Sequence, residues 1–286
     1  MEFKNVGIVG CGIMGAGLTQ LCAQTGYKVI VSEINDAALQ KGLKSIDSAL
    51  GRQVEKGKMK AEDKAAIMGR IKGTTNMADF SVCDIVIEAA TEDMNIKKSI
   101  FTQLDKVCKP GALLATNTSV LCVAEIAGVT KRAENVLGMH FAQPVPVTKI
   151  LEMARTIANS DAIVAAGKAF GESIGKIVVV TKDLPGFISN RIFSSYLLNA
   201  VRLVQDGIAT PEDIDTVFKA GVGYAMGPLE TLDYVGIDTV YNGAVAMYEE
   251  LHDPQYAPPP LLHRMIKLGW LGRKTGRGFY DYNKDK

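Results

Sequence analysis

The sequence has little of what marks membrane, secreted or nucleic-acid-binding proteins. No apolar run approaches the length of a membrane-spanning helix, so no membrane partner is expected. The 32 Lys and Arg residues nearly balance the 31 Asp and Glu residues, and a net charge of +1 gives no electrostatic reason to expect nucleic acid. The five cysteines are odd in number and form no CxxC pair, which favours a reducing, cytoplasmic location over a disulfide framework. No signal sequence is expected either, because a glycine-rich loop already begins at Gly10.

Short apolar runs alternate with helical stretches through the first 180 residues or so. Strand-like runs are expected at residues 6–9, 28–32, 71–75, 84–89, 112–116, 136–140, 150–153 and 177–180. Helical periodicity lies between them, at 13–24, from Leu39 to near Gly57, at 62–68 and at 96–107. This repeated strand–helix–strand order predicts an α/β fold with a Rossmann-type, doubly wound and mainly parallel sheet.

Strand signals cease near residues 183–186, and helical periodicity replaces them. Helices are expected at 188–205, from Pro211 behind the N-cap Thr210, from Gly227, and at 261–268. Residues 269–282, rich in glycine and aromatic side chains, resist assignment. We therefore expect an α/β domain with a helical hairpin over residues 1–185 and a second, all-helical domain over 186–286.

The first expected strand leads into Gly10-Cys11-Gly12-Ile13-Met14-Gly15, a GxGxxG pattern. Alone the pattern is weak, because glycines also serve ordinary turns and helix packing. At a strand-to-helix turn, however, Gly10 permits the tight turn, Gly12 lets a pyrophosphate approach the backbone, and Gly15 lets the helix pack on the strand. The N-terminus of the helix, with Ile13 and Met14 in its first turn, then receives the negative charge. The motif predicts a bound dinucleotide.

A glutamate, Glu33, stands at the end of the second expected strand. There a carboxylate can accept hydrogen bonds from both hydroxyls of the adenosine ribose, whereas a 2′-phosphate would meet a like charge. An exposed strand-end glutamate without a role is the alternative. With no arginine nearby in the sequence, the pattern favours NAD over NADP as the cofactor.

Only three histidines are present, and one of them, His140, ends a strand of the α/β part, where ligands meet such sheets. Removal of a hydride from a carbinol carbon requires a base for the hydroxyl proton, and a neutral imidazole oriented by a carboxylate is suited to that task. Glu152 in the next expected strand is the natural orienting group. Taken alone, each has another interpretation: His140 as a core histidine and Glu152 as a solvated strand end.

Several further motifs, spread over nearly the whole chain, resemble those of the short-chain L-3-hydroxyacyl-CoA dehydrogenases, a family whose bacterial members include 3-hydroxybutyryl-CoA dehydrogenases. They are Glu88-Ala89-Ala90, Asn117-Thr118-Ser119, Gly138-Met139-His140-Phe141, Pro144-Val145-Pro146-Val147, Pro185-Gly186-Phe187 with Asn190-Arg191, Met226-Gly227-Pro228, Gly272-Arg273-Lys274-Thr275-Gly276 and Gly278-Phe279-Tyr280.

The resemblance implies NAD as cofactor, a short-chain 3-hydroxyacyl-CoA or 3-oxoacyl-CoA as substrate, and a homodimer formed through the helical domain. It implies His140 as the general acid/base and Glu152 as its partner, with Ser119 and Asn190 donating to the reacting oxygen or thioester carbonyl. The Asn117 motif and, with less weight, Glu92 and Lys97 are placed near the cofactor. Ser119 as a helix N-cap and Asn190 as a turn or capping residue are the alternatives. No metal site is predicted.

A basic cluster follows the long helix, and the family places this hairpin over the nucleotide end of coenzyme A. The cluster comprises Arg52, Lys56, Lys58 and Lys60. Its cations can pair with phosphates, and they can equally be a solvated helix end where positive charge is favourable. The cluster as a whole, including Lys56, is the predicted contact.

The chain departs from the family pattern around the expected active site. Ala142 and Gln143 stand where relatives have Phe and Asn, and Gln143 is the candidate substrate contact among them. Val120 replaces a serine, Thr148 a methionine and Asn199 a glutamate. These departures leave the acyl group open.

Two other functions remain open at this stage. A dehydrogenase of a free β-hydroxy acid shares the N-terminal fingerprint but normally uses lysine as the acid/base. A non-catalytic NAD-binding protein of the crystallin-like kind is the other alternative, against which His140 and Glu152 argue.

Overall fold

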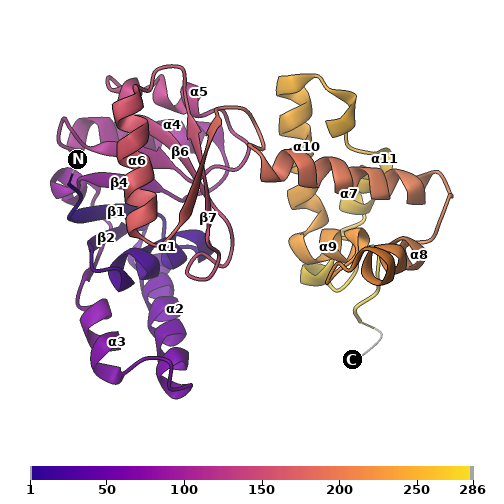
Figure 1. The fold of residues 1–286 in the computed structure, drawn as a ribbon, viewed down its shortest axis with the longest axis horizontal. Coiled ribbons are helices and arrows are strands. Elements are labelled where there is room, and N and C mark those ends of the chain that lie inside the picture. The colour runs from indigo at the N-terminus through magenta and orange to yellow at the C-terminus, as the bar shows by residue number, and fades with distance from the viewer. Residues whose placement is uncertain (1, 284–286) are drawn as a thin grey trace. The chain divides into compact units, whose positions relative to one another are not determined.

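The computed structural model describes residues 2–283, and the chain divides into two units, Met1–Leu184 and Pro185–Lys286. Each unit has its own hydrophobic core. Figure 1 shows strands and helices in the first unit and helices in the second. No helix among the described residues is long and apolar enough to cross a membrane.

The first unit is built on one eight-stranded sheet with the strand order β3-β2-β1-β4-β5-β6-β7-β8. Neighbouring strands are parallel throughout except for the pair β6 and β7, which is antiparallel. The strands are β1 (Asn5–Val9), β2 (Lys28–Ser32), β3 (Ile71–Thr74), β4 (Ile85–Glu88), β5 (Leu113–Thr116), β6 (Val136–Phe141), β7 (Ile150–Arg155) and β8 (Ile177–Lys182). The predicted Rossmann-type, mainly parallel sheet is confirmed.

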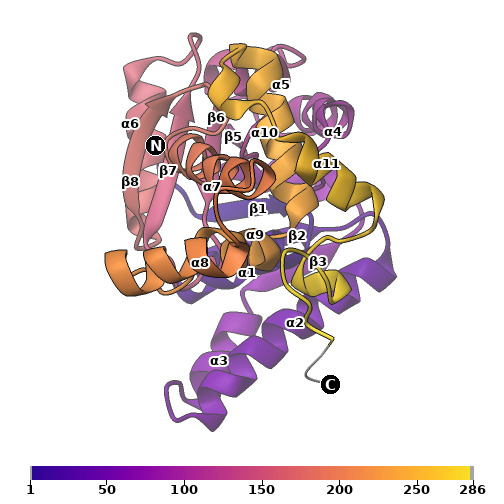
Figure 2. The ribbon, with the colours of Figure 1, turned by 90° about the vertical axis from the view of Figure 1, so that its right-hand side faces the viewer.

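Helices flank this sheet. They are α1 (Ile13–Gln24), α2 (Asp36–Glu55), α3 (Ala61–Met68), α4 (Met94–Val107), α5 (Val123–Ala127) and α6 (Asp161–Ser173). The helices α2 and α3 pack together as the expected hairpin (Figure 2). The N-cap Asn35 starts α2 by accepting a hydrogen bond from the Ala38 N–H, and Asp93 starts α4 by accepting one from Ile96.

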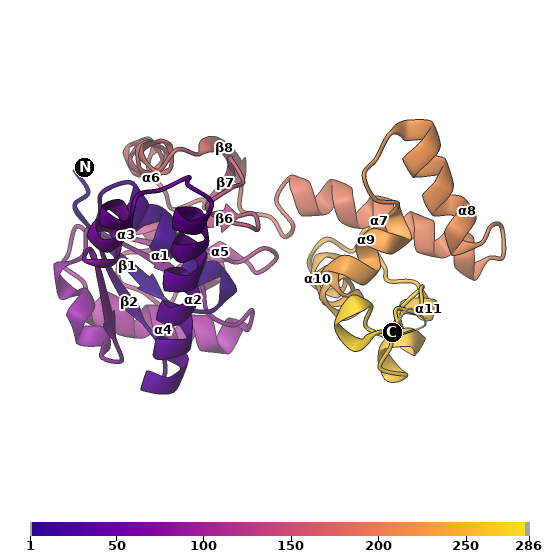
Figure 3. The ribbon, with the colours of Figure 1, turned by 90° about the horizontal axis from the view of Figure 1, so that it is seen from below.

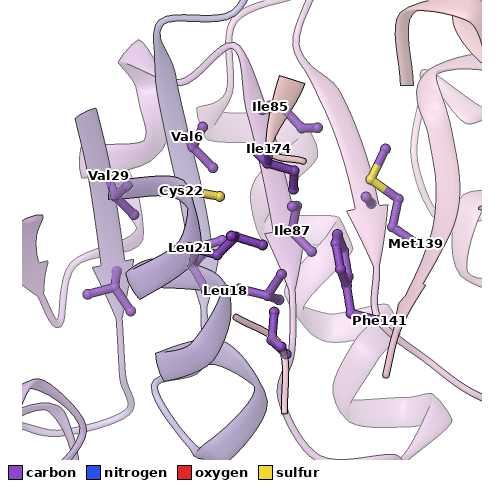
Figure 4. Packing of buried hydrophobic residues seen from close by; sticks show 14 of the residues in the cluster. Val6, Leu18, Leu21, Cys22, Val29, Ile85, Ile87, Met139, Phe141 and Ile174 are labelled. Carbon is purple, nitrogen blue, oxygen red and sulfur yellow. The ribbon is translucent and has the colours of Figure 1, made fainter. Parts of the chain in front are cut away.

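The core beneath α1 and α6 is assembled from strands such as β1, β2, β4 and β5, which are mostly apolar and buried, as parallel strands covered by helices require. Leu18, Leu21 and Cys22 of α1 lie beside Val6 of β1 and Ile87 of β4 (Figure 4). This packing fixes the glycine loop before α1 to the sheet.

Two helices of this unit, α5 and α6, were not predicted. The reason is clear for α6, because glycines at its packing face weaken the helical signal. A Cβ atom on Gly167 would lie 2.6 Å from Leu137 Cδ1, and one on Gly171 would lie 2.6 Å from Val178 Cγ2. Close approach of the helix to the sheet therefore requires glycine, despite the cost in helix propensity.

The second unit is all-helical as predicted (Figure 3). Its helices are α7 (Ser189–Gln205), α8 (Pro211–Thr216), α9 (Pro228–Val235), α10 (Ile237–Leu251) and α11 (Pro260–Lys267), with a π-helical turn at Val217–Val222. Thr210 caps α8 by accepting from the Asp213 N–H, as its sequence signature indicates.

Two buried carboxylates hold the unassigned segment 269–282, namely Asp233 of α9 and Asp215 of α8, which accepts from the Tyr280 hydroxyl at 2.7 Å. Asp233 is 1% exposed and accepts hydrogen bonds from the backbone of Phe279 and Tyr280 and from the Tyr282 hydroxyl. Gly272 and Gly278 approach Asp233 so closely that a Cβ on either would overlap it. Long-range contacts of this kind have no local sequence signature.

Candidate active site

The glycine loop has the geometry that its sequence predicts. Gly10 has φ +92°, a conformation that glycine adopts without strain, and a Cβ on Gly15 would lie 1.9 Å from the Gly10 carbonyl oxygen. A Cβ on Gly12, the N-cap of α1, would meet nothing within 4 Å, so the backbone there is open to a ligand. The loop therefore fits a dinucleotide pyrophosphate at the helix N-terminus.

A cavity of about 970 Å³ opens beside this loop, at the carboxyl ends of β1, β2 and β4. Gly10, Gly12, Ile13, Met14 and Glu33 all line it, together with Gln143 from the loop after β6. None of the described residues lining the cavity is a lysine or arginine. Its size and its apolar walls suit a cofactor.

Glu33 follows β2 directly and is held in place by backbone donors. Its Oε1 accepts from the Cys11 N–H at 2.7 Å, and its Oε2 accepts from the Ile34 N–H at 3.1 Å. The carboxylate is thus fixed between the end of β2 and the glycine loop, where the predicted ribose hydroxyls would lie.

One wall of the cavity was not predicted from the sequence. It is formed by side chains of α4 and of the segments after β2 and β3, namely Ile34, Thr75, Met77, Ile96, Ser99, Ile100 and Gln103. The lining residues of α4 recur at spacings of three and four, which places them on one face of the helix. Such a face ordinarily packs against a hydrophobic core, so the spacing does not indicate a cavity wall.

The predicted cofactor residues Glu92, which is exposed, and Lys97, which is buried, belong to one polar network. Lys97 is 1% exposed, and its ammonium pairs with the fully buried Glu88 at 2.8 and 2.9 Å and with Glu92 at 3.4 Å. Thr116 also donates to Glu88. The network binds the ends of β4 and β5 to the start of α4.

Glu92 extends this network to the loop that carries Ser119. Its Oε1 accepts from the Thr118 hydroxyl and from the Ser119 N–H at 2.9 Å. The helix α5 begins after its N-cap Cys122, so Ser119 is not a helix N-cap. Asn117 Oδ1 accepts from the Phe141 N–H at 3.0 Å, which joins this loop to the residue after His140.

His140 and Glu152 are directly paired across the antiparallel strands β6 and β7. The imidazole Nδ1 lies 2.9 Å from Glu152 Oε2, and the Glu152 side chain is 6% exposed. A carboxylate only accepts, so Nδ1 carries the proton of the neutral ring and Nε2 carries the lone pair of a base. The arrangement is a histidine hydrogen-bonded to a buried carboxylate, so Glu152 is not a solvated strand end, and the catalytic role of the pair stays a prediction.

The remaining predicted residues lie apart from this group or in the other unit. Lys56 and the other members of the basic cluster are exposed at the end of α2 and in the turn to α3. Asn190 is the second residue of α7, in the helical unit, and its part in the same site stays a prediction. No group of three or more His, Cys, Asp or Glu side chains within residues 2–283 could hold a metal ion.

Family models match both units of the chain. The model for the 3-hydroxyacyl-CoA dehydrogenase NAD binding domain matches residues 5–184, and the model for the C-terminal domain of the same enzymes matches residues 186–282. The chain belongs to the 3-hydroxyacyl-CoA dehydrogenase family. This family uses NAD, in agreement with the cofactor predicted from Glu33.

Relatives within the 3-hydroxyacyl-CoA dehydrogenase family align over the full length. A probable 3-hydroxybutyryl-CoA dehydrogenase of Bacillus subtilis is 41% identical over 284 residues, which cover 99% of each chain. A 3-hydroxybutyryl-CoA dehydrogenase of Mycobacterium tuberculosis is 42% identical over 281 residues, 98% of each chain. The solved (S)-3-hydroxybutyryl-CoA dehydrogenase of Ralstonia eutropha superimposes with a TM-score of 0.95 at 41% identity, covering 98% of this chain and 99% of that one.

Proposed function

We propose that this NAD-dependent oxidoreductase transfers a hydride between NAD(H) and C3 of a short-chain (S)-3-hydroxyacyl-CoA or 3-oxoacyl-CoA, with 3-hydroxybutyryl-CoA and acetoacetyl-CoA as its main pair. The His140–Glu152 hydrogen bond carries this proposal, because it supplies the base that the reaction needs. The names of the relatives support the choice of acyl group.

In the direction of oxidation, NAD held by the glycine loop and Glu33 would supply the acceptor for the hydride that leaves C3 with the electron pair of the C–H bond. His140 Nε2 takes the hydroxyl proton, and the ionised Glu152 stabilises the imidazolium that results. In the reverse direction the imidazolium returns this proton to the oxygen. Ser119, Asn190 and Gln143 are the polar groups assigned to the C3 oxygen or the thioester carbonyl.

The exposed cluster at the end of α2, comprising Arg52, Lys56, Lys58 and Lys60, is the proposed contact for the phosphates of coenzyme A. Four cations on one short stretch provide several donors for a polyanionic group. Charge reversal of Lys56 and Lys58 together should raise KM for acetoacetyl-CoA and leave kcat unchanged.

The proposal also includes a homodimer formed through the helical unit and a cytoplasmic location. Large exposed apolar side chains of that unit support the dimer, among them Ile192, Val217 and Leu268 at 68%, 61% and 63% exposure. Light scattering on the purified protein measures the oligomeric state. The odd number of cysteines supports the location.

Purified protein assayed optically for NADH oxidation tests the function. The expected order of catalytic efficiency places acetoacetyl-CoA above longer 3-oxoacyl-CoAs, with free acetoacetate inactive. Turnover of free acetoacetate alone would instead indicate a hydroxy-acid dehydrogenase, and NADH binding without any turnover would indicate a non-catalytic protein.

A further inference from the structure

A buried lysine contacts the loop that joins His140 to Glu152. Lys176 lies just before β8 and is 6% exposed, and no Asp or Glu in the described part of the chain is within ion-pairing distance of it. Its ammonium instead donates to two backbone carbonyls of the loop, Val145 O at 2.6 Å and Thr148 O. Burial lowers the pKa of Lys176, as expected where no carboxylate compensates the charge.

The same loop is held from its own side by Thr148. The Thr148 hydroxyl donates to Ala142 O at 2.7 Å and to Pro144 O at 3.2 Å. It thus closes the loop on both sides of Gln143. An apolar side chain at this position would have no donor for these bonds.

The loop is also packed against α1. Val145 is 2% exposed, and a Cβ atom on Gly17 would lie 2.9 Å from the Val145 Cβ. With Val145 seated on α1 and both ends of the loop tied, Gln143 between them lines the cofactor cavity. The hydrogen bonds of Thr148 and Lys176 therefore hold the backbone on both sides of Gln143.

Satisfying two carbonyls does not by itself require a buried cation. The Val145 carbonyl is buried with its residue, so its donor must come from the protein, but a neutral donor would also satisfy it, and the neighbouring Ile177 N–H already pairs with Lys149 O at 2.7 Å. Placing an uncompensated ammonium in the interior costs free energy. A single ammonium that donates to both carbonyls holds them in one fixed geometry. This geometry explains the buried lysine better than the need for two hydrogen-bond donors does.

We propose that Lys176 and Thr148 are positioning residues, which clamp the loop between β6 and β7 so that the Gln143 amide stands at the reacting end of the cofactor cavity. The clamp acts through Gln143 on the reaction stated under Proposed function, and it rests on that function.

A double-mutant cycle tests the clamp. Lys176→Met is expected to lower kcat on acetoacetyl-CoA about tenfold while the Kd for NADH changes less than about threefold, since small displacements of positioned groups affect the reacting step most. In a Gln143→Ala background the same change should lower kcat less than about twofold. Equal factors in the two backgrounds, or an unaffected kcat, would overturn the proposal. Lys168→Met, at an exposed position of α6, is the matched control and should behave as wild type.

Thr148 provides a second test that does not depend on the folding of the lysine variant. Thr148→Val should lower kcat several-fold, and Thr148→Ser, which keeps the hydroxyl, should restore it. Equal kcat values for these two variants would contradict the role of the hydroxyl.

Hydrogen exchange separates failure of the clamp from failure of the proposed reaction. Amide exchange in the peptide covering residues 142–149 should rise about tenfold in Lys176→Met, with the peptides of α1 unchanged. This readout does not need turnover: faster exchange in a protein inactive on every acyl-CoA would reject the reaction and keep the clamp, whereas unchanged exchange would reject the clamp.

Discussion

The Cys11 backbone N–H donates a 2.7 Å hydrogen bond to Glu33 Oε1, joining the second position of the glycine fingerprint to the carboxylate that ends β2. The bond fixes the negative charge in the cofactor cavity, whose lining contains no lysine or arginine among the described residues. We therefore propose that local charge at Glu33 discriminates between the two nicotinamide cofactors.

We expect the catalytic efficiency with NADH to exceed that with NADPH at least about 100-fold, because the 2′-phosphate would lie against Glu33 without a compensating cation. Steady-state kinetics with both cofactors measures the ratio. Glu33→Gln keeps an acceptor for the Cys11 N–H and removes the charge. It should therefore lower the ratio of the catalytic efficiency with NADH to that with NADPH. Similar efficiencies with the two cofactors in the unaltered protein would contradict the role of Glu33.

Removal of one partner from the buried Glu88–Lys97 pair should strongly destabilise the first unit. Glu88→Gln leaves the ammonium of Lys97 buried with Glu92 at 3.4 Å as its remaining counter-charge, and a loss of about 3–5 kcal/mol in the free energy of unfolding is expected. Urea denaturation measures it. The adjacent Lys98→Met, which breaks a partly exposed pair with Glu125, is the control and should cost less than about 1 kcal/mol. Equal losses in the two variants would show that burial does not set the strength of the first pair.

The pocket departures Ala142 and Gln143 are expected to shape chain-length preference. The double change Ala142→Phe with Gln143→Asn adds an aromatic ring and shortens the amide side chain, so it should preserve folding and shift preference towards the shortest acyl chains. A single lost substrate hydrogen bond corresponds to a change of up to about tenfold. The ratio of catalytic efficiencies for four-carbon and longer 3-oxoacyl-CoAs decides, and an unchanged ratio would remove both positions from the pocket.

Asp233 should make the stability of the helical unit depend on pH. Burial, with a smaller contribution from Asp215, raises the pKa of Asp233 above its ordinary 3.8. The folded state therefore binds this proton more tightly than the unfolded chain does, so the stabilising contribution is present below the unfolded pKa and is lost as the pH rises through the folded pKa.

Asp233→Asn should destabilise the helical unit by about 1–3 kcal/mol, because one carboxylate acceptor for the 279–282 segment is replaced by a donor. This deficit should be largest at acid pH and shrink towards neutrality. Urea titrations at several pH values measure the difference in the free energy of unfolding between the unaltered protein and Asp233→Asn. A difference that grows as the pH rises would contradict the predicted pH dependence.

Local patterns predicted most of the first unit because its strands and helices follow their own periodicity. The helix α1 and the strand β2 begin and end where their apolar runs do. The pairing of His140 with Glu152 was also accessible, since consecutive strands joined by a short turn bring such residues to one place.

Contacts between distant segments could not be predicted in this way. Three such contacts join segments whose separation in the sequence follows no helix or strand periodicity. They are the Lys97–Glu88 pair, the Lys176 hydrogen bonds to the loop after β6, and the hydrogen bonds of residues 279–282 to Asp233. Lysine side chains are also ordinarily exposed, so the sequence alone would not predict that Lys97 and Lys176 are buried.

The central claim is that His140, oriented by Glu152, exchanges a proton with the C3 oxygen. The most direct measurement is kcat on acetoacetyl-CoA for His140→Gln, together with the Kd for NADH. A loss of about 100- to 10,000-fold in kcat with unchanged NADH affinity is predicted, and a somewhat smaller loss for Glu152→Gln, which keeps the shape but removes the charge. Turnover by His140→Gln close to that of the unaltered protein would contradict the account.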